Sequence, residues 1–143
     1  MQTFIPSTSP SECAKVLDWR RLGKQRVEAM QILNCLETPN SWVNHPAVEM
    51  WRGYEEYLKV YANIIIEEWI YRGYNNNMKL YKINWSRVEF PSWWSDDRIH
   101  SSHRANLLRK DPKHYGQFGW SEEPAEGYWW PYRRKNGEWV VCE

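Results

Sequence analysis

The residues best suited to chemistry on an anion lie together between Asp18 and Glu28. Five side chains in this stretch are cations or amides that can contact phosphates or bases: Arg20, Arg21, Lys24, Gln25 and Arg26. On a helix with 3.6 residues per turn, Arg20 and Lys24 share a side with the apolar Leu17 and Val27. Cations beside an apolar stripe need a partner or water. The stretch therefore predicts a site for a polyanion, with solvated helix surface as the alternative.

The charge of the chain is distributed unevenly. Its net charge is only +1, yet Lys15–Arg26 and Arg98–His114 each hold five Lys or Arg residues against one acid. We expect the two basic segments to form one face on an otherwise acidic body. The third predicted helix and the residues after it supply the second set of candidate contacts: His100, His103, Arg104, Arg109, Lys113, Tyr115 and Gln117.

Tryptophan is the compositional outlier, with 11 residues against three Phe. Most of these rings must belong to the core, but some can stack on bases or wedge between them. Trp93 and Trp94 are adjacent in a predicted loop and are either lids on the core or wedges. His45 precedes a proline and is either a helix-start contact or a ligand-binding residue.

Start and stop signals predict three main helices. The first begins at Ser9-Pro10 and is expected to reach Leu36, with a bend, a junction or a close approach of another group at Gly23, which costs about 1 kcal/mol relative to Ala in a helix. The second is expected from His45-Pro46 to Arg72-Gly73. The third is expected from Asp96 to Lys110.

The last part of the chain predicts a β-hairpin, in which Tyr128–Tyr132 and Glu138–Val141 flank a turn at Asn136-Gly137. No repeat or linker is visible. We therefore expect residues 1–143 to form a single, mainly α domain with long irregular loops.

Several classes of protein are disfavoured by the sequence. The three cysteines are widely spaced and form no CxxC, which indicates reduced thiols in a cytoplasmic protein. The start lacks the features of a signal peptide, and no segment is apolar enough to span a membrane. His100 and His103 have a spacing that metals can use, but no third ligand is evident. We expect no metal and no cofactor.

Three blocks of the sequence stand out by their order and spacing. The first block is Trp19–Leu22 with Arg26-Val27. The second runs from His45 through Tyr54–Leu58 to Arg72–Asn75. The third is His100–Leu108 with Tyr115–Phe118. Together they resemble the small pyrimidine-dimer DNA glycosylases of the phage endonuclease V type, and more closely their bacterial and phage relatives. The resemblance covers about residues 1–120 and leaves 121–143 as an extension.

This resemblance implies a helical, monomeric enzyme that binds damaged double-stranded DNA without an obligate protein partner, associated with the nucleoid or with phage DNA. In the family, the α-amine of the chain attacks the sugar C1′, the base leaves, and the resulting imine allows β-elimination. A helix carboxylate assists, and arginines hold phosphates around a flipped nucleotide. The chemistry is plausible on general grounds, because an α-amine has a pKa near 8 and is partly neutral at pH 7.

The sequence departs from the family at two points that bear on the site. Residue 2 is Gln, which is bulky, so we expect Met1 to be retained and its amine to be the nucleophile. The carboxylate of the family aligns with Arg21 or Gly23, so the expected acid is Glu28, with Asp18 as the other candidate. Lys24 is a second candidate amine if burial among cations lowers its pKa.

The leading hypothesis is a DNA glycosylase, with or without AP-lyase activity, that acts on damaged or modified pyrimidines. A non-catalytic module that binds distorted or modified duplex is the alternative. An interaction protein with merely solvated cations is the third reading. All of them depend on whether the first and third helices meet beside the amino terminus.

Overall fold

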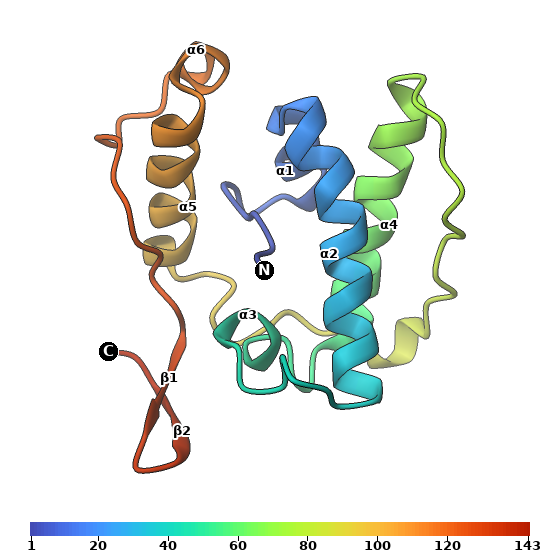
Figure 1. Ribbon diagram of the computed structural model, residues 1–143, viewed down its shortest axis with the longest axis vertical. Helices are drawn as coiled ribbons and strands as arrows, with labels where there is room; N and C mark the ends of the chain where they lie inside the picture. The colour runs from blue at the N-terminus through green and yellow to red at the C-terminus, as the bar shows by residue number, and fades with distance from the viewer.

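The computed structural model describes residues 1–143 and consists mainly of α-helices (Figure 1). The three long helices are α2 (Trp19–Glu37), α4 (Glu55–Tyr71) and α5 (Asp97–Lys110). The short ones are α1 (Pro10–Val16), α3 (Pro46–Glu49) and α6 (Pro112–Tyr115), and single 3₁₀ turns occur at Trp85–Arg87 and Gly116–Phe118. The predicted mainly α class with three main helices is confirmed. No helix combines the length and the apolar character needed to cross a bilayer.

The first predicted helix is two helices, and the break is at Leu17-Asp18 rather than at Gly23. Leu17 and Asp18 have extended backbone, and the Asp18 carboxylate accepts the Arg21 N–H at 3.4 Å as the N-cap of α2. An aspartate at this position satisfies an N–H that has no partner within the helix, so a new helix can begin here.

Gly23 lies inside α2, against α4. A Cβ added at Gly23 would lie 2.8 Å from Cζ3 of Trp69. The glycine therefore permits the close approach of an indole ring, which is one of the three roles expected for it.

The second predicted helix is also divided. His45 is the N-cap of α3, with its Nδ1 accepting the Ala47 N–H at 3.0 Å, and a turn that includes Gly53 at φ +88° separates α3 from α4. A positive φ at this point cannot belong to a right-handed helix, so the expected continuous helix was wrong. The helix-start role of His45 and the stop at Arg72-Gly73 are both confirmed.

The core is one cluster to which all six helices and residues 4–5 contribute. Its largest fully buried side chains include Trp51 and Tyr61. Trp93 and Trp94 are 4% and 5% exposed, and the Trp93 ring meets the Trp51 ring edge-on at 5.1 Å. Their indole N–H groups donate to the carbonyls of Met50 and Thr8. These two tryptophans are thus buried side chains that cover the core.

Residues 2–5 form an extended segment between α2 and α5, with no strand beside it (Figure 1). The Gln25 amide of α2 replaces a strand partner, because Oε1 accepts the Phe4 N–H and Nε2 donates to the Gln2 carbonyl, each at 2.8 Å. The Tyr61 hydroxyl of α4 donates to the Phe4 carbonyl at 2.8 Å. Buried backbone groups need such partners, so these side chains make the buried path of the segment possible.

Helix α5 holds the same segment from the other side. His103 Nδ1 accepts the Ile5 N–H at 2.8 Å, and His100 Nδ1 lies 2.9 Å from the Ile5 carbonyl oxygen. The two histidines are three residues apart, so they share one helix face. That face fixes both polar backbone groups of Ile5.

The C-terminal hairpin is confirmed, with a shifted first strand. Strands β1 (Tyr132–Lys135) and β2 (Glu138–Val141) are antiparallel, and Lys135 pairs with Glu138 around a two-residue turn. Asn136 and Gly137 both have positive φ, as a tight I′-type hairpin turn requires. A two-residue turn pairs the residues directly beside it, so the strand that precedes the turn must reach Lys135. The first strand is therefore Tyr132–Lys135 and not Tyr128–Tyr132.

Candidate active site

A cleft of about 900 Å³ opens between the amino-terminal half of α2, the junction of α5 and α6, and the start of the chain. It is lined by Met1, Gln2, Phe4, Asp18, Trp19, Arg20, Arg21, Lys24, Glu28, Arg72, Tyr74, Lys110, Asp111, His114 and Tyr128. The first and third predicted helices therefore converge beside the amino terminus. Met1, Arg20, Arg21, Lys24 and Glu28, five of the expected site residues, share this cleft.

Glu28 is the carboxylate closest to the start of the chain. Its side chain is largely buried, and Oε2 accepts the backbone N–H of Gln2 at 2.6 Å. Lys24 Nζ lies 3.9 Å from the other carboxylate oxygen, Oε1. The Gln2 N–H that contacts Glu28 directly follows Met1 in the chain, so this contact holds the carboxylate close to the Met1 amine. Lys24, the second candidate amine, lies beside the other oxygen of the same carboxylate.

Asp18, the alternative acid, has a different set of partners. The Tyr115 hydroxyl donates to Oδ1, and Arg21 donates to the same oxygen at 3.0 Å. Burial acts to raise the pKa of Asp18, but these hydrogen bonds from Tyr115 and Arg21 outweigh it and lower the pKa. Ionised Asp18 therefore links the start of α2 to α6 through its hydrogen bond with the buried Tyr115.

The cleft contains more cations than acids. Five Arg and Lys side chains line it, against three carboxylates. Arg20 and Lys24 are exposed, whereas Arg72 donates to the carbonyls of Ala14 and Lys15 at the end of α1, each at 3.0 Å. Partial burial, together with the charges of Arg109, Arg21 and Lys24, lowers the pKa of Lys110. Cations crowded in this way are stabilised by a bound polyanion.

Two exposed aromatic rings stand at the rim of the cleft. Trp19 and Tyr74 are 53% and 39% exposed, and their ring centroids are 6.5 Å apart. The Arg20 guanidinium lies 5.3 Å from the Trp19 ring, and Tyr74 packs on Trp69 at 4.4 Å. The rim thus combines a π surface with a cation, which suits a nucleobase and its phosphate.

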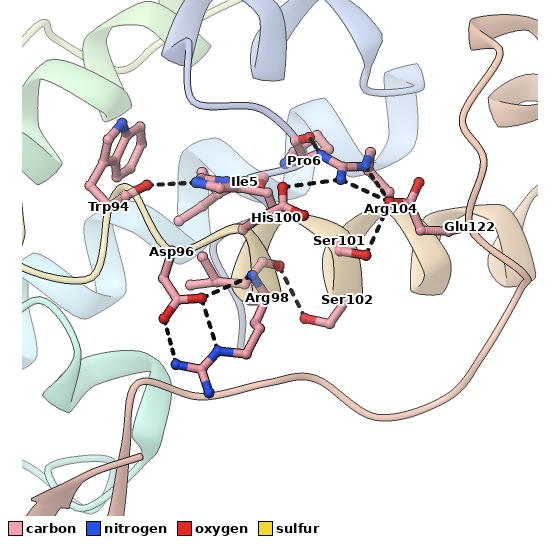
Figure 2. Close-up of polar contacts among 12 residues, drawn as sticks. Ile5, Pro6, Trp94, Asp96, Arg98, His100, Ser101, Ser102, Arg104 and Glu122 are labelled. Atoms are coloured by element: carbon pink, nitrogen blue, oxygen red, sulfur yellow. Dashed lines mark hydrogen bonds and ion pairs between the residues drawn. The ribbon is translucent and has the colours of Figure 1, made fainter. Parts of the chain in front are cut away.

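None of the four predicted contacts on α5, His100, His103, Arg104 and Arg109, lines the cleft. His100 and His103 are buried against Ile5, and the second ring nitrogen of His100 lies 2.7 Å from the Trp94 carbonyl oxygen (Figure 2). Arg104 donates to Glu122 and to the Pro6 carbonyl, each at 2.9 Å. These side chains stabilise the buried segment and the loop after α6, and Lys110 is the cation of α5 that lines the cleft.

The remaining predicted contacts are also outside the cleft. Gln25 is buried under the amino-terminal segment, and Arg26 donates to the Asn76 amide oxygen at 2.7 Å while lying 4.3 Å from the Trp69 ring. Arg109 contacts Asn106, and Gln117 donates to the His114 carbonyl. Lys113 is exposed on α6.

His45 does not line the cleft, and its ring lies between those of Trp42 and Trp130, with centroids 5.8 and 6.0 Å away. Burial lowers the pKa of His45, and the positive charge of the amino terminus lowers it further.

The cleft also contains residues that were not among the predicted site residues: Gln2, Phe4, Trp19, Arg72, Tyr74, Lys110, Asp111, His114 and Tyr128. Arg72 and Tyr74 belong to the helix ending on which the family resemblance rests, so that ending was an available signal. Tyr128 comes from the loop before the hairpin, and no sequence pattern places it here. No three His, Cys, Asp or Glu side chains converge in a way that would hold a metal ion.

A comparison with protein families gives one match. The model of a family described as pyrimidine dimer DNA glycosylase matches residues 1–82. The matched part contains the start of the chain, α2 with Glu28, and α4. No curated protein and no solved structure matches the chain.

Proposed function

The chain belongs to the pyrimidine dimer DNA glycosylase family, and from this premise we propose that it excises a damaged or modified pyrimidine from duplex DNA, with the Met1 amine as nucleophile. The observation that carries the proposal is the 2.6 Å hydrogen bond from the Gln2 N–H to Glu28. This contact holds a carboxylate beside the start of the chain in a cleft rich in cations.

The proposed reaction begins with a nucleotide turned out of the duplex into the cleft. The neutral Met1 amine forms a bond to C1′ of the sugar, and the bond between C1′ and the base breaks. The base leaves with the electron pair and takes a proton. Ring opening then gives an imine between Met1 and C1′, and loss of a proton from C2′ allows β-elimination of the 3′ phosphate.

Glu28 is proposed as the group that handles protons at this centre. A carboxylate beside a developing cationic sugar stabilises its charge and can accept a proton from the attacking amine. Arg20, Arg21 and Lys110 are proposed to hold the phosphates that flank the extruded nucleotide.

Two other amines are candidates for the nucleophile. Lys24 lies on the far side of Glu28, at 3.9 Å. If Met1 were removed, the nitrogen that donates to Glu28 would itself be the α-amine of Gln2. The site geometry is compatible with attack by either.

Borohydride trapping on duplex DNA with an abasic site tests the amine route. Borohydride reduces the imine to a stable secondary amine, so peptide mapping of the adduct identifies the nucleophile. We expect the adduct on Met1, and we expect Lys24→Met to retain it. Base release from a duplex with a lesion, without any adduct on the abasic-site duplex, would indicate a monofunctional glycosylase. Duplex binding without base release from any lesion would instead indicate the non-catalytic binding module.

The substrate is best sought with a panel of duplexes that carry different pyrimidine lesions and hypermodified pyrimidines. Single lesions are scored for released base. Pyrimidine dimers are scored for the abasic sugar left in the strand, because the excised base stays joined to its neighbour. Pyrimidine dimers are the first substrates to examine, because the family is described by them. Glu28→Gln serves as the control in every assay, since it separates enzymatic release from spontaneous loss of the base.

A further inference from the structure

The C-terminal hairpin and the loop before it enclose a second hollow, which the proposed chemistry does not use. It has a volume of about 440 Å³. Five aromatic side chains line it: Tyr128, Trp129, Trp130, Tyr132 and Trp139. The family match ends at residue 82, so all five aromatic residues of the hollow lie outside the matched part, which contributes Asn44 and Pro46 to its lining.

Three consecutive cations, Arg133, Arg134 and Lys135, lie on the first strand of the hairpin. The Arg134 guanidinium lies 5.2 Å from the Trp139 ring and donates to Gly137 and Asn44, so it is fixed by the protein. Arg133, which also lines the hollow, and Lys135, at the end of the same strand, are exposed and make no hydrogen bond or ion pair within the chain. They remain available to an external anion.

The hollow and the cleft are neighbours that share one lining residue. Tyr128 lines both of them, and its ring centroid is 5.9 Å from that of Trp130. From α6 the chain passes along α5 to the hairpin, which lies at the opposite end of the long axis of the molecule (Figure 1). A DNA strand that leaves the cleft past Tyr128 would thus meet aromatic rings first and the hairpin cations next.

We propose that the hairpin is a second DNA subsite, in which the hollow stacks one unpaired base and Arg133 and Lys135 contact the phosphates beside it. Aromatic rings accept any base by its face, and cations track the backbone, so this subsite is independent of sequence. The proposal rests on DNA as the substrate of the proposed function. It predicts that the protein contacts additional nucleotides on one side of the lesion. It also predicts tighter binding when the DNA on that side is unpaired.

Equilibrium binding across a salt series tests the subsite. The substrates are an abasic-site duplex and the same duplex with a single-stranded gap on one or the other side of the lesion. Arg133→Ala with Lys135→Ala is expected to lower the slope of log Kd against log salt by about 1 for each phosphate contact removed. Lys79→Ala with Lys82→Ala, two exposed lysines in the segment after α4, is the matched control and is expected to leave the slope unchanged.

Crosslinking gives an independent readout. A bromodeoxyuridine stepped outward from the lesion is expected to crosslink to the peptide that contains Trp130 or Trp139, on one side of the lesion only. Equal slopes for the hairpin and control variants, or crosslinks confined to peptides of the cleft, would overturn the subsite while leaving base excision intact. Failure of the parent protein to bind duplex DNA would overturn both proposals.

Discussion

At the scale of single residues, the site depends on the Glu28 carboxylate and the backbone that it contacts. Glu28→Gln keeps an oxygen that can accept the Gln2 N–H but removes the charge and the base. We expect base release in a single turnover to slow about 10²- to 10⁴-fold, the usual contribution of a positioned acid or base. The matched control is Glu49→Gln, which removes a surface partner of Arg52 and should leave the rate unchanged.

His103 makes stability depend on pH. Burial lowers its pKa from 6.5 to about 3, and its Nε2 has no hydrogen-bond partner. The unfolded chain therefore binds a proton between pH 6.5 and about 3 that the folded chain does not. Stability from this residue is complete above pH 6.5 and is lost as the pH falls, by at most about 1.4 kcal/mol per pH unit.

The measurement is urea unfolding at a series of pH values. His103→Asn retains an acceptor for the Ile5 N–H but does not titrate, so the dependence between pH 6.5 and 4 should become shallower. An unchanged slope in His103→Asn would contradict the assigned role.

Residue types alone indicated part of this site. A run of cations beside an apolar stripe was sufficient to predict Arg20, Arg21 and Lys24 in the cleft. Gln25, His100 and His103 were expected to contact DNA, yet their partners are backbone groups of residues 2–5. The sequence pattern of a polar side chain is the same whether it binds a ligand or a buried extended segment, so only the three-dimensional structure distinguishes the two.

At the scale of elements, the contact between α2 and α4 depends on Gly23. Trp69 cannot easily move away from a Cβ at that position, because Arg26 lies over its ring and its Nε1 donates to the Asn75 carbonyl at 2.7 Å. We expect Gly23→Ala to destabilise the protein by about 1–3 kcal/mol, as overpacking does, despite the better helix propensity of Ala. Thermal unfolding measures this, and adding Trp69→Leu should recover part of the loss.

The amino-terminal segment is positioned by Gln25. Gln25→Leu leaves the Phe4 N–H and the Gln2 carbonyl without partners, at a cost of about 1–3 kcal/mol for each buried group. We expect excision at saturating DNA to slow at least about tenfold, because the amine is no longer held in place. The Kd for DNA should not change.

The control for this variant is Gln31→Leu, on the exposed face of the same helix. A parallel loss of binding and excision in Gln25→Leu would indicate general damage to the cleft. Excision at the parent rate would show that the segment does not need this amide.

The sequence predicted helices better than it predicted their ends. The caps at Ser9 and Asp96 and the stop at Gly73 are local and were recognised. The breaks at Asp18 and Gly53 were missed, because the apolar spacing continues across each of them and masks the turn. The pair Asn136-Gly137 predicted the position of the hairpin turn correctly. The turn requires a positive φ at both of its central residues, and few other residue types adopt one.

At the scale of the whole molecule, the net charge of +1 hides a cleft with five cations. DNA binding should therefore be strongly dependent on salt, with log Kd changing by about 0.9 for each phosphate contacted per unit of log salt. Arg20→Ala should lower this slope by about 1 and leave excision at saturating DNA unchanged. Arg87→Ala, an exposed arginine in a 3₁₀ turn far along the chain, is the control.

The overall arrangement could be predicted only in outline. The expectation that the first and third helices meet beside the amino terminus was correct, since Arg20 and Lys110 share one cleft with Met1. The threading of residues 2–5 through the interior could not be foreseen. Its hydrogen bonds reach across up to 98 positions, and no local pattern encodes such distances.

This threading has a consequence for biosynthesis. The opening residues leave the ribosome long before His100 and His103, whose side chains secure them. A nascent or truncated chain therefore carries a free amine without the scaffold that aims it. We expect excision to require a chain that extends through α5, so a chain that ends before His100 should lack this activity.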